Sequence, residues 1–181
     1  MSVTIEELDR LYQALPPRPT VSARVDSLNV RPGPNLREPR DSLEFDPTRG
    51  AIGDRWEQKT WLYLPDGRPD PRVQIALCNT SILALIQAVT GVCHHPGDTI
   101  FTALDLSATN LPVGARLKIG TVVIEISDVE NDACAKFSAH YGAVVLDWIR
   151  LPKNRDLRLR GAFAKVVSGG TVRRGEAITR L

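Results

Sequence analysis

The chain has 181 residues and a formal net charge of only +2 at pH 7. That length is enough for one domain with a substantial core, and so small a charge gives no argument for nucleic-acid binding. No apolar run is long enough to cross a bilayer, and no basic leader precedes an apolar stretch. Three cysteines at irregular spacing exclude a disulfide framework and a structural zinc motif, so we expect a cytoplasmic protein.

The N-terminal segment predicts one short helix. Thr4 opens a capping box, and apolar residues recur at helical spacing over residues 5–15, after which two consecutive prolines end the helix. We therefore expect an N-terminal helical appendage over residues 1–19 and a β-rich domain over residues 20–181.

The first half of that domain predicts two strands and one helix. Residues 20–30 alternate apolar and polar side chains, as a half-buried strand does, and residues 72–77 predict a more buried strand. Asn79 is placed to cap a helix over residues 81–89, which has a wide apolar face. Residues 31–50 are rich in Pro, Arg and Asp, and they predict an irregular, mobile loop.

The second half is again dominated by strand patterns. Residues 91–98 predict a surface loop with two incidental histidines, and residues 113–127 predict a β-hairpin. Residues 159–167 predict a strand, and short final strands follow around Val172 and Ile178. Strands separated by turns, with a few short helices and no regular βαβ alternation, predict a mainly β (β-rich α+β) fold of the barrel or curled-sheet type.

The segment around Cys134 is the most informative part of the chain. Asn131 or Asp132 is placed to cap a helix that Gly142 ends, which would put the cysteine on the first helical turn. A thiol at that position faces the positive end of the helix dipole, which favours the thiolate. Residues 143–149 either extend this helix or begin a second one.

Two cationic side chains follow on the same predicted helix. Lys136 and His140 lie one turn apart on a face of their own, where they can stabilise a thiolate at Cys134 or simply face solvent. A thiolate among cations is the chemistry of a sulfur carrier, a soft-metal ligand or a nucleophile. The alternative is a small buried hydrophobe, and we interpret Cys78 and Cys93 as incidental.

Several motifs occur in a fixed order around this cysteine. They are residues 50–56 (GAIGDRW), 97–102 (GDTIFT), 111–120 (LPVGARLKIG) and 163–176 (FAKVVSGGTVRRGE), with Cys134 before the last. This ordered set resembles the MOSC domain, the C-terminal module of molybdenum-cofactor sulfurases, which also occurs as small stand-alone bacterial proteins. Three positions depart from the common family pattern, since Trp56, Thr99 and Ala133 stand where His, Asn and Pro are frequent.

The resemblance implies a barrel-like MOSC domain with a few short helices. It also implies that Cys134 is a ligand of molybdenum in the molybdenum cofactor (molybdopterin), or carries sulfur as a persulfide. The pyridoxal-phosphate chemistry of full-length sulfurases belongs to a separate domain, so no pyridoxal phosphate is expected in this chain alone. The expected partner is a sulfur donor of the cysteine desulfurase type or a redox partner protein.

Six further residues are candidate cofactor contacts under this resemblance. Arg55 can grip a phosphate or pterin group, or else form with Asp54 an internal ion pair that fixes the loop. Asn110 can bond a cofactor edge or serve an ordinary turn. The full set of candidates is Asp54, Arg55, Asn110, Lys136, Arg160 and Lys165, the last two supplying positive potential.

Two functional hypotheses follow from these patterns. The first is a MOSC-type protein that acts in sulfur transfer or in molybdenum-dependent redox chemistry through Cys134. The second is a non-catalytic β-barrel module that binds an anion or a partner protein and has only a structural cysteine. A nucleic-acid barrel is disfavoured because the basic C-terminal strands lack interleaved aromatic residues for base stacking.

Overall fold

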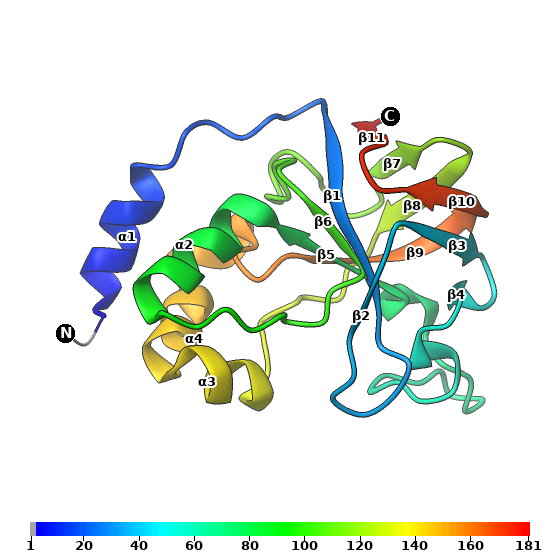
Figure 1. Ribbon diagram of the computed structural model, residues 1–181, viewed down its shortest axis with the longest axis horizontal. Coiled ribbons are helices and arrows are strands. Elements are labelled where there is room, and N and C mark those ends of the chain that lie inside the picture. Colours follow the sequence, from blue (N-terminus) through cyan, green and yellow to red (C-terminus); the bar gives the residue numbers. More distant parts are fainter. Residues whose placement is uncertain (1–2) are drawn as a thin grey trace.

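A β-barrel stands at one side of the molecule and four helices gather at the other (Figure 1) in the computed structural model, which describes residues 3–181. The helices are α1 (Ile5–Gln13), α2 (Thr80–Thr90), α3 (Ala135–Tyr141) and α4 (Ala143–Arg150), with 3-10 turns at Arg55–Glu57, Pro71–Val73 and Pro152–Leu157. The strands are β1 (Ser22–Val30), β2 (Glu38–Arg40), β3 (Ser42–Asp46), β4 (Gly50–Ala51), β5 (Ile75–Asn79), β6 (Ile100–Thr102), β7 (Arg116–Ile119), β8 (Val122–Ile126), β9 (Ala162–Ser168), β10 (Gly170–Arg173) and β11 (Ala177–Arg180).

Seven strands close the barrel in the order β1, β6, β5, β9, β8, β7 and β11, which returns to β1. The strand β5 pairs in parallel with β6, while the other barrel neighbours run antiparallel. Closure leaves no free sheet edge within the ring. The predicted mainly β, barrel-like fold with a few short helices is therefore confirmed.

The predicted hairpin shows why these residues form the barrel. Leu117 and Ile119 on β7, and Val122 and Ile124 on β8, alternate with exposed or half-buried neighbours, so every second side chain enters the core. Gly120 between the strands has φ +58°, a left-handed conformation that suits a tight turn. The barrel interior is accordingly filled by aliphatic side chains.

The helices enclose a second apolar cluster outside the barrel. Leu8 of α1 and Trp148 of α4 are fully buried in it. The predicted caps form as expected: Thr4 Oγ1 accepts from Glu7 N at 3.2 Å, and Asn79 Oδ1 accepts from the first backbone N–H groups of α2. No helix within residues 3–181 is long and apolar enough to cross a membrane.

The prediction of an irregular loop over residues 31–50 is wrong, because this segment contains β2, β3 and β4. Its pattern is short, but Leu43 and Phe45 alternate into the core and pair with β10, more than a hundred residues later in the chain. Whether so short a segment forms a strand depends on partners that are distant in the sequence. The segment 143–149 forms a separate helix, since Gly142 between α3 and α4 has φ +92°.

Candidate functional site

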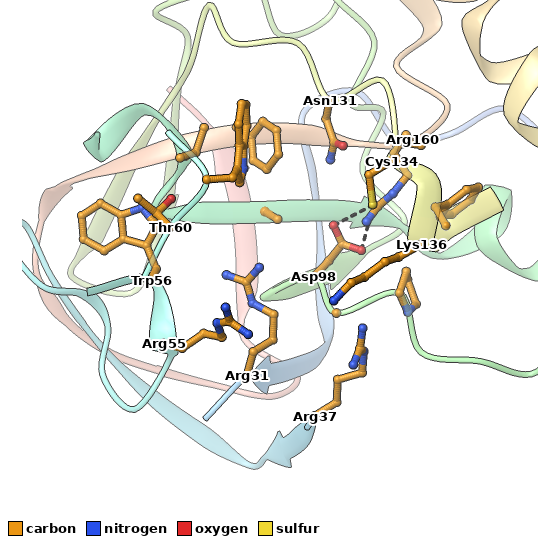
Figure 2. Close-up of a pocket in the computed structure, with 18 of the residues that line it drawn as sticks. Arg31, Arg37, Arg55, Trp56, Thr60, Asp98, Asn131, Cys134, Lys136 and Arg160 are labelled. Carbon is orange, nitrogen blue, oxygen red and sulfur yellow. Dashed lines mark hydrogen bonds and ion pairs between the residues drawn. The ribbon is translucent and has the colours of Figure 1, made fainter. Parts of the chain in front are cut away.

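A pocket of about 590 Å³ lies against the outer face of the barrel, where strands β5 and β9 meet helix α3 and the loop between β1 and β2 (Figure 2). We call it the cysteine pocket. Four of the predicted site residues line it: Cys134, Arg55, Lys136 and Arg160. The chain thus brings together side chains that are more than a hundred positions apart in sequence.

The sulfur of Cys134 is presented by the start of α3. Cys134 is itself the N-cap residue, in an extended conformation, and its side chain is exposed. The prediction that Asn131 or Asp132 caps the helix is wrong, because Ala133 adopts φ +65° and this left-handed turn delays the helix until Ala135. The thiol remains at the positive end of a helix, although one of only seven residues.

A buried ion pair forms the barrel side of the pocket beside the thiol (Figure 2). Arg160 Nη1 donates to both carboxylate oxygens of Asp98, at 2.7 and 2.8 Å, and the Arg160 side chain is only 12% exposed. Burial opposes the positive charge, but Asp98 and the neighbouring thiols Cys78 and Cys134 outweigh it, so the pKa of Arg160 is raised. A fixed cation therefore stands next to Cys134.

Local backbone geometry sets the position of that cation. Gly161 follows Arg160 at the start of β9 and has φ +110°. A Cβ on Gly161 would lie 1.9 Å from the backbone oxygen of Leu77 on the neighbouring strand β5, so only glycine fits there. The guanidinium also lies over the Phe137 ring of α3, at 5.2 Å from its centroid, which links the barrel to the cysteine helix.

The pocket carries more free positive charge than negative charge. Four lining cations, Arg37, Arg55, Lys59 and Lys136, make no ion pair with any residue in 3–181. Lys136 Nζ is 3.4 Å from an amide oxygen in the β1–β2 loop. This surplus favours an anionic ligand.

The acids of the same wall are already neutralised. Glu130 pairs with Arg155 at 2.9 Å and Asp132 with Arg150 at 3.2 Å, and neither arginine lines the pocket. Because these carboxylates have cationic partners outside the pocket, they do little to offset its lining cations.

Asp54 lies behind the pocket wall and organises another arginine. It is buried, and it accepts from the backbone N, Nε and Nη2 of Arg31 at 2.8, 3.0 and 2.9 Å. The ion pair that fixes this loop is therefore Asp54–Arg31, and Arg55 is left facing the pocket. Bidentate arginine–carboxylate contacts of this kind hold both groups in one geometry.

Asn110 and Lys165 do not line this pocket. Asn110 is buried elsewhere, where its Nδ2 donates to the backbone oxygen of Asp105 and its oxygens accept from Arg180. Lys165 points outward from β9 and pairs with Glu125 on β8 at 2.8 Å. Asn110 thus has the turn role that was its alternative, and Lys165 is held by a contact across two strands.

The histidine of the 91–98 loop, taken from the sequence as incidental, is part of the site. The rings of His94 and His140 stack, with centroids 3.5 Å apart and planes 15° apart, and both line the pocket. The Tyr141 hydroxyl donates to the His94 backbone oxygen. Burial, His140 and Arg37 together lower the pKa of His94, which favours the neutral form of that ring.

The pocket is rich in hydrogen-bond donors that lack a partner. Arg37 Nε, Trp56 Nε1, Asn131 Nδ2 and Arg160 Nε are buried and line the pocket without an acceptor among residues 3–181. Buried donors are normally satisfied. No local sequence pattern marks Arg37 or Asp98 as a site residue, although Asp98 lies in one of the four family-like segments. The arrangement suits an anionic ligand with many acceptors.

No family model matches the chain, and no curated protein matches it. Solved structures do match. YuaD from Bacillus subtilis is 22% identical with a TM-score of 0.60, and the match covers 87% of this chain and 94% of YuaD. YiiM from Escherichia coli is 14% identical with a TM-score of 0.59, covering 87% of this chain and 69% of YiiM.

YiiM from Geobacillus stearothermophilus is also similar, at 13% identity and a TM-score of 0.62, with 88% of this chain and 75% of that protein covered. At these identities the likeness concerns the fold alone. These matches therefore support the barrel-like architecture of the chain.

Proposed function

We propose that this chain binds the molybdenum cofactor in the cysteine pocket, with Cys134 facing the metal. The observation that carries the proposal is the exposed Cys134 thiol on the wall of a pocket of about 590 Å³ whose cations exceed its free acids. The MOSC-type fold supports it at the level of architecture.

The residues of the pocket fit such a group in charge and in donor type. A thiolate is a strong, soft ligand for a transition metal. Arg55 and Lys136 carry free positive charge for a phosphate, and the unpartnered donors Asn131 Nδ2 and Arg160 Nε suit the acceptor-rich edge of a pterin. When bound, the cofactor supplies a redox-active molybdenum centre.

The chain's own residues hold that arrangement in place. Asp98 keeps Arg160 charged and oriented beside Cys134. Asp54 does the same for Arg31 on the opposite wall. These residues position charge before a ligand arrives, so little reorganisation is needed on binding.

A second candidate function is sulfur carriage, and the exposure of Cys134 favours it. In that reaction the thiolate attacks the outer sulfur of a donor persulfide; the donor's S–S bond breaks, a new S–S bond forms on Cys134, and the donor leaves as a thiolate. The donor would be a protein of the cysteine desulfurase type. In the redox role, the partner would be an electron-transfer protein.

The test of the first candidate is the metal and pterin content of protein purified from a host that makes molybdenum cofactor. We expect molybdenum and oxidised-pterin fluorescence in the wild type and no molybdenum in Cys134→Ala. Arg55→Ala should contain less pterin than the wild type. The matched control is Arg49→Ala, an exposed arginine paired with Glu57 outside the pocket. Neither metal nor pterin in the wild type would reject the cofactor role.

The second candidate is tested by incubating the protein with a cysteine desulfurase and cysteine. Mass spectrometry should then show one extra sulfur on Cys134, released by cyanide as thiocyanate and lost in Cys134→Ala. If neither experiment gives a signal and Cys134→Ala changes only stability, the chain is instead a binding module with a structural cysteine.

A further inference from the structure

The cysteine pocket has a second end that the proposed function leaves unused. Figure 2 shows Trp56 and Thr60 at one end and Cys134 with Arg160 at the other. Trp61 and Phe163 also line the pocket, and their ring centroids are 6.0 Å apart. We call Trp56, Thr60, Trp61 and Phe163 the aromatic end.

The floor of the aromatic end is apolar, and one of its rings is bare. Phe163 lies on the outward face of β9 opposite Ala76 of β5, and both line the pocket together with Val73. Trp61 is 63% exposed, which is unusual for so large an apolar side chain. An indole face beside an aromatic wall attracts a planar ring by stacking.

A buried hydrogen-bond donor, Trp56 Nε1, also indicates a ligand at the aromatic end. Trp56 is only 4% exposed, and its Nε1 has no partner among residues 3–181. The Trp56 backbone N–H donates to Asp54 Oδ1 at 2.9 Å, and the ring packs so close to Gly50 that an added Cβ there would lie 3.2 Å from its Cε3 atom. A fixed, buried N–H in a pocket wall calls for an acceptor from a ligand.

We propose that the aromatic end binds a planar heteroaromatic substrate ring, which stacks on Trp61 and accepts a hydrogen bond at its edge from Trp56 Nε1. The proposal extends the proposed function, on which it rests, by naming a substrate class for the same pocket. A saturated ring lacks the flat face that Trp61 requires, and a ring without an edge acceptor leaves the Trp56 N–H unsatisfied.

The test uses calorimetric titration with two rings. Quinazolin-4-one has a flat face and a carbonyl acceptor, whereas indole has a flat face and only a donor. Trp56→Phe, which keeps a ring but removes the N–H, should weaken quinazolin-4-one about tenfold and leave indole unchanged. Trp61→Ala should weaken both rings.

The matched control is Tyr63→Ala, an exposed aromatic on the same connecting segment that does not line the pocket. It should change neither affinity. Equal affinities of quinazolin-4-one for wild type and Trp56→Phe, an equal loss in Tyr63→Ala and Trp61→Ala, or no binding to the wild type would each overturn the proposal.

The titrations are run on protein from a host that makes molybdenum cofactor and from one that does not. We expect quinazolin-4-one to bind both preparations. Binding to the cofactor-free protein alone would assign the aromatic end to the pterin, overturning the substrate assignment while the cofactor role stands. If no preparation contains metal or pterin but the ring still binds as described, the cofactor role fails and the ring site remains.

Discussion

The barrel side of the cysteine pocket is buried and ion-paired, whereas the helical side is exposed and carries a left-handed alanine. Asp98 lies just before β6 and Arg160 just before β9, and Arg160 Nη1 donates to both carboxylate oxygens of Asp98. Cys134 follows Ala133 at φ +65° and begins a helix without a side-chain cap bond. The difference teaches that the fold fixes the Arg160 charge and leaves the Cys134 sulfur exposed, where a ligand or partner can reach it.

The largest effect is expected from breaking the barrel side. Asp98→Ala leaves Arg160 buried without its partner, and removal of one member of a buried pair costs about 3–5 kcal/mol. The exposed pair Arg49–Glu57 is the matched control, and Glu57→Ala should cost less than about 1 kcal/mol. Urea unfolding measures both; similar losses in the two variants would contradict the contrast between buried and exposed pairs.

The helical side is probed at Ala133. Proline is frequent at this position in the MOSC domains that the motifs resemble, but its ring holds φ near about −65°, while Ala133 has φ +65°. Ala133→Pro should therefore lower stability by more than about 1 kcal/mol, and Ala133→Gly should raise it by about 1 kcal/mol. Thermal unfolding measures the sign of both stability changes. An Ala133→Pro variant as stable as the wild type would mean that this segment readily adopts another backbone conformation.

The coupling between the two sides is tested by the labelling rate of the thiol. Cys93 is also exposed, so Cys93→Ser serves as the background, whereas burial raises the pKa of Cys78 and keeps it inert. Arg160→Gln should slow iodoacetamide labelling of Cys134, and Asp98→Asn should speed it. A change of about 1 kcal/mol corresponds to a factor of about five.

The opposite signs are the critical result of that experiment. Removing the Arg160 charge takes away the cation that stands beside the attacking sulfur, while removing the Asp98 charge leaves that cation less neutralised. Circular dichroism confirms that each variant is folded. Two changes of the same sign would show that the ion pair affects only the access of the reagent to the sulfur.

The smallest effect concerns the His94–His140 stack. The pKa of His94 is lowered in the folded protein, by burial first and then by His140 and Arg37. The unfolded chain therefore binds more protons at mildly acidic pH, so stability falls as pH drops below the ordinary histidine pKa of about 6.5. His94→Gln should lose less stability than the wild type between pH 7.5 and 5.5 in urea titrations; an equal loss would assign the acid sensitivity elsewhere.

The sequence by itself determined the elements whose signal is local. The Thr4 cap of α1, the Asn79 cap of α2, and the alternation in β7 and β8 depend on neighbours a few residues away, and all three are confirmed. The turn and strand motifs before and after Cys134 indicated a mainly β fold for a related reason, since glycine turns and strand patterns depend on consecutive residues.

Only the tertiary structure decided the rest of the site. The strands of residues 31–50, the pairing of Asp54 with Arg31, the burial of Asp98 against Arg160, and the placement of Asn110 away from the pocket depend on partners far away in sequence. Their energies come from burial and cross-strand contacts, which no local pattern contains. Cys134 was therefore recognisable as a candidate from the sequence, whereas the charged groups and aromatic rings around it are brought together only by the folded barrel.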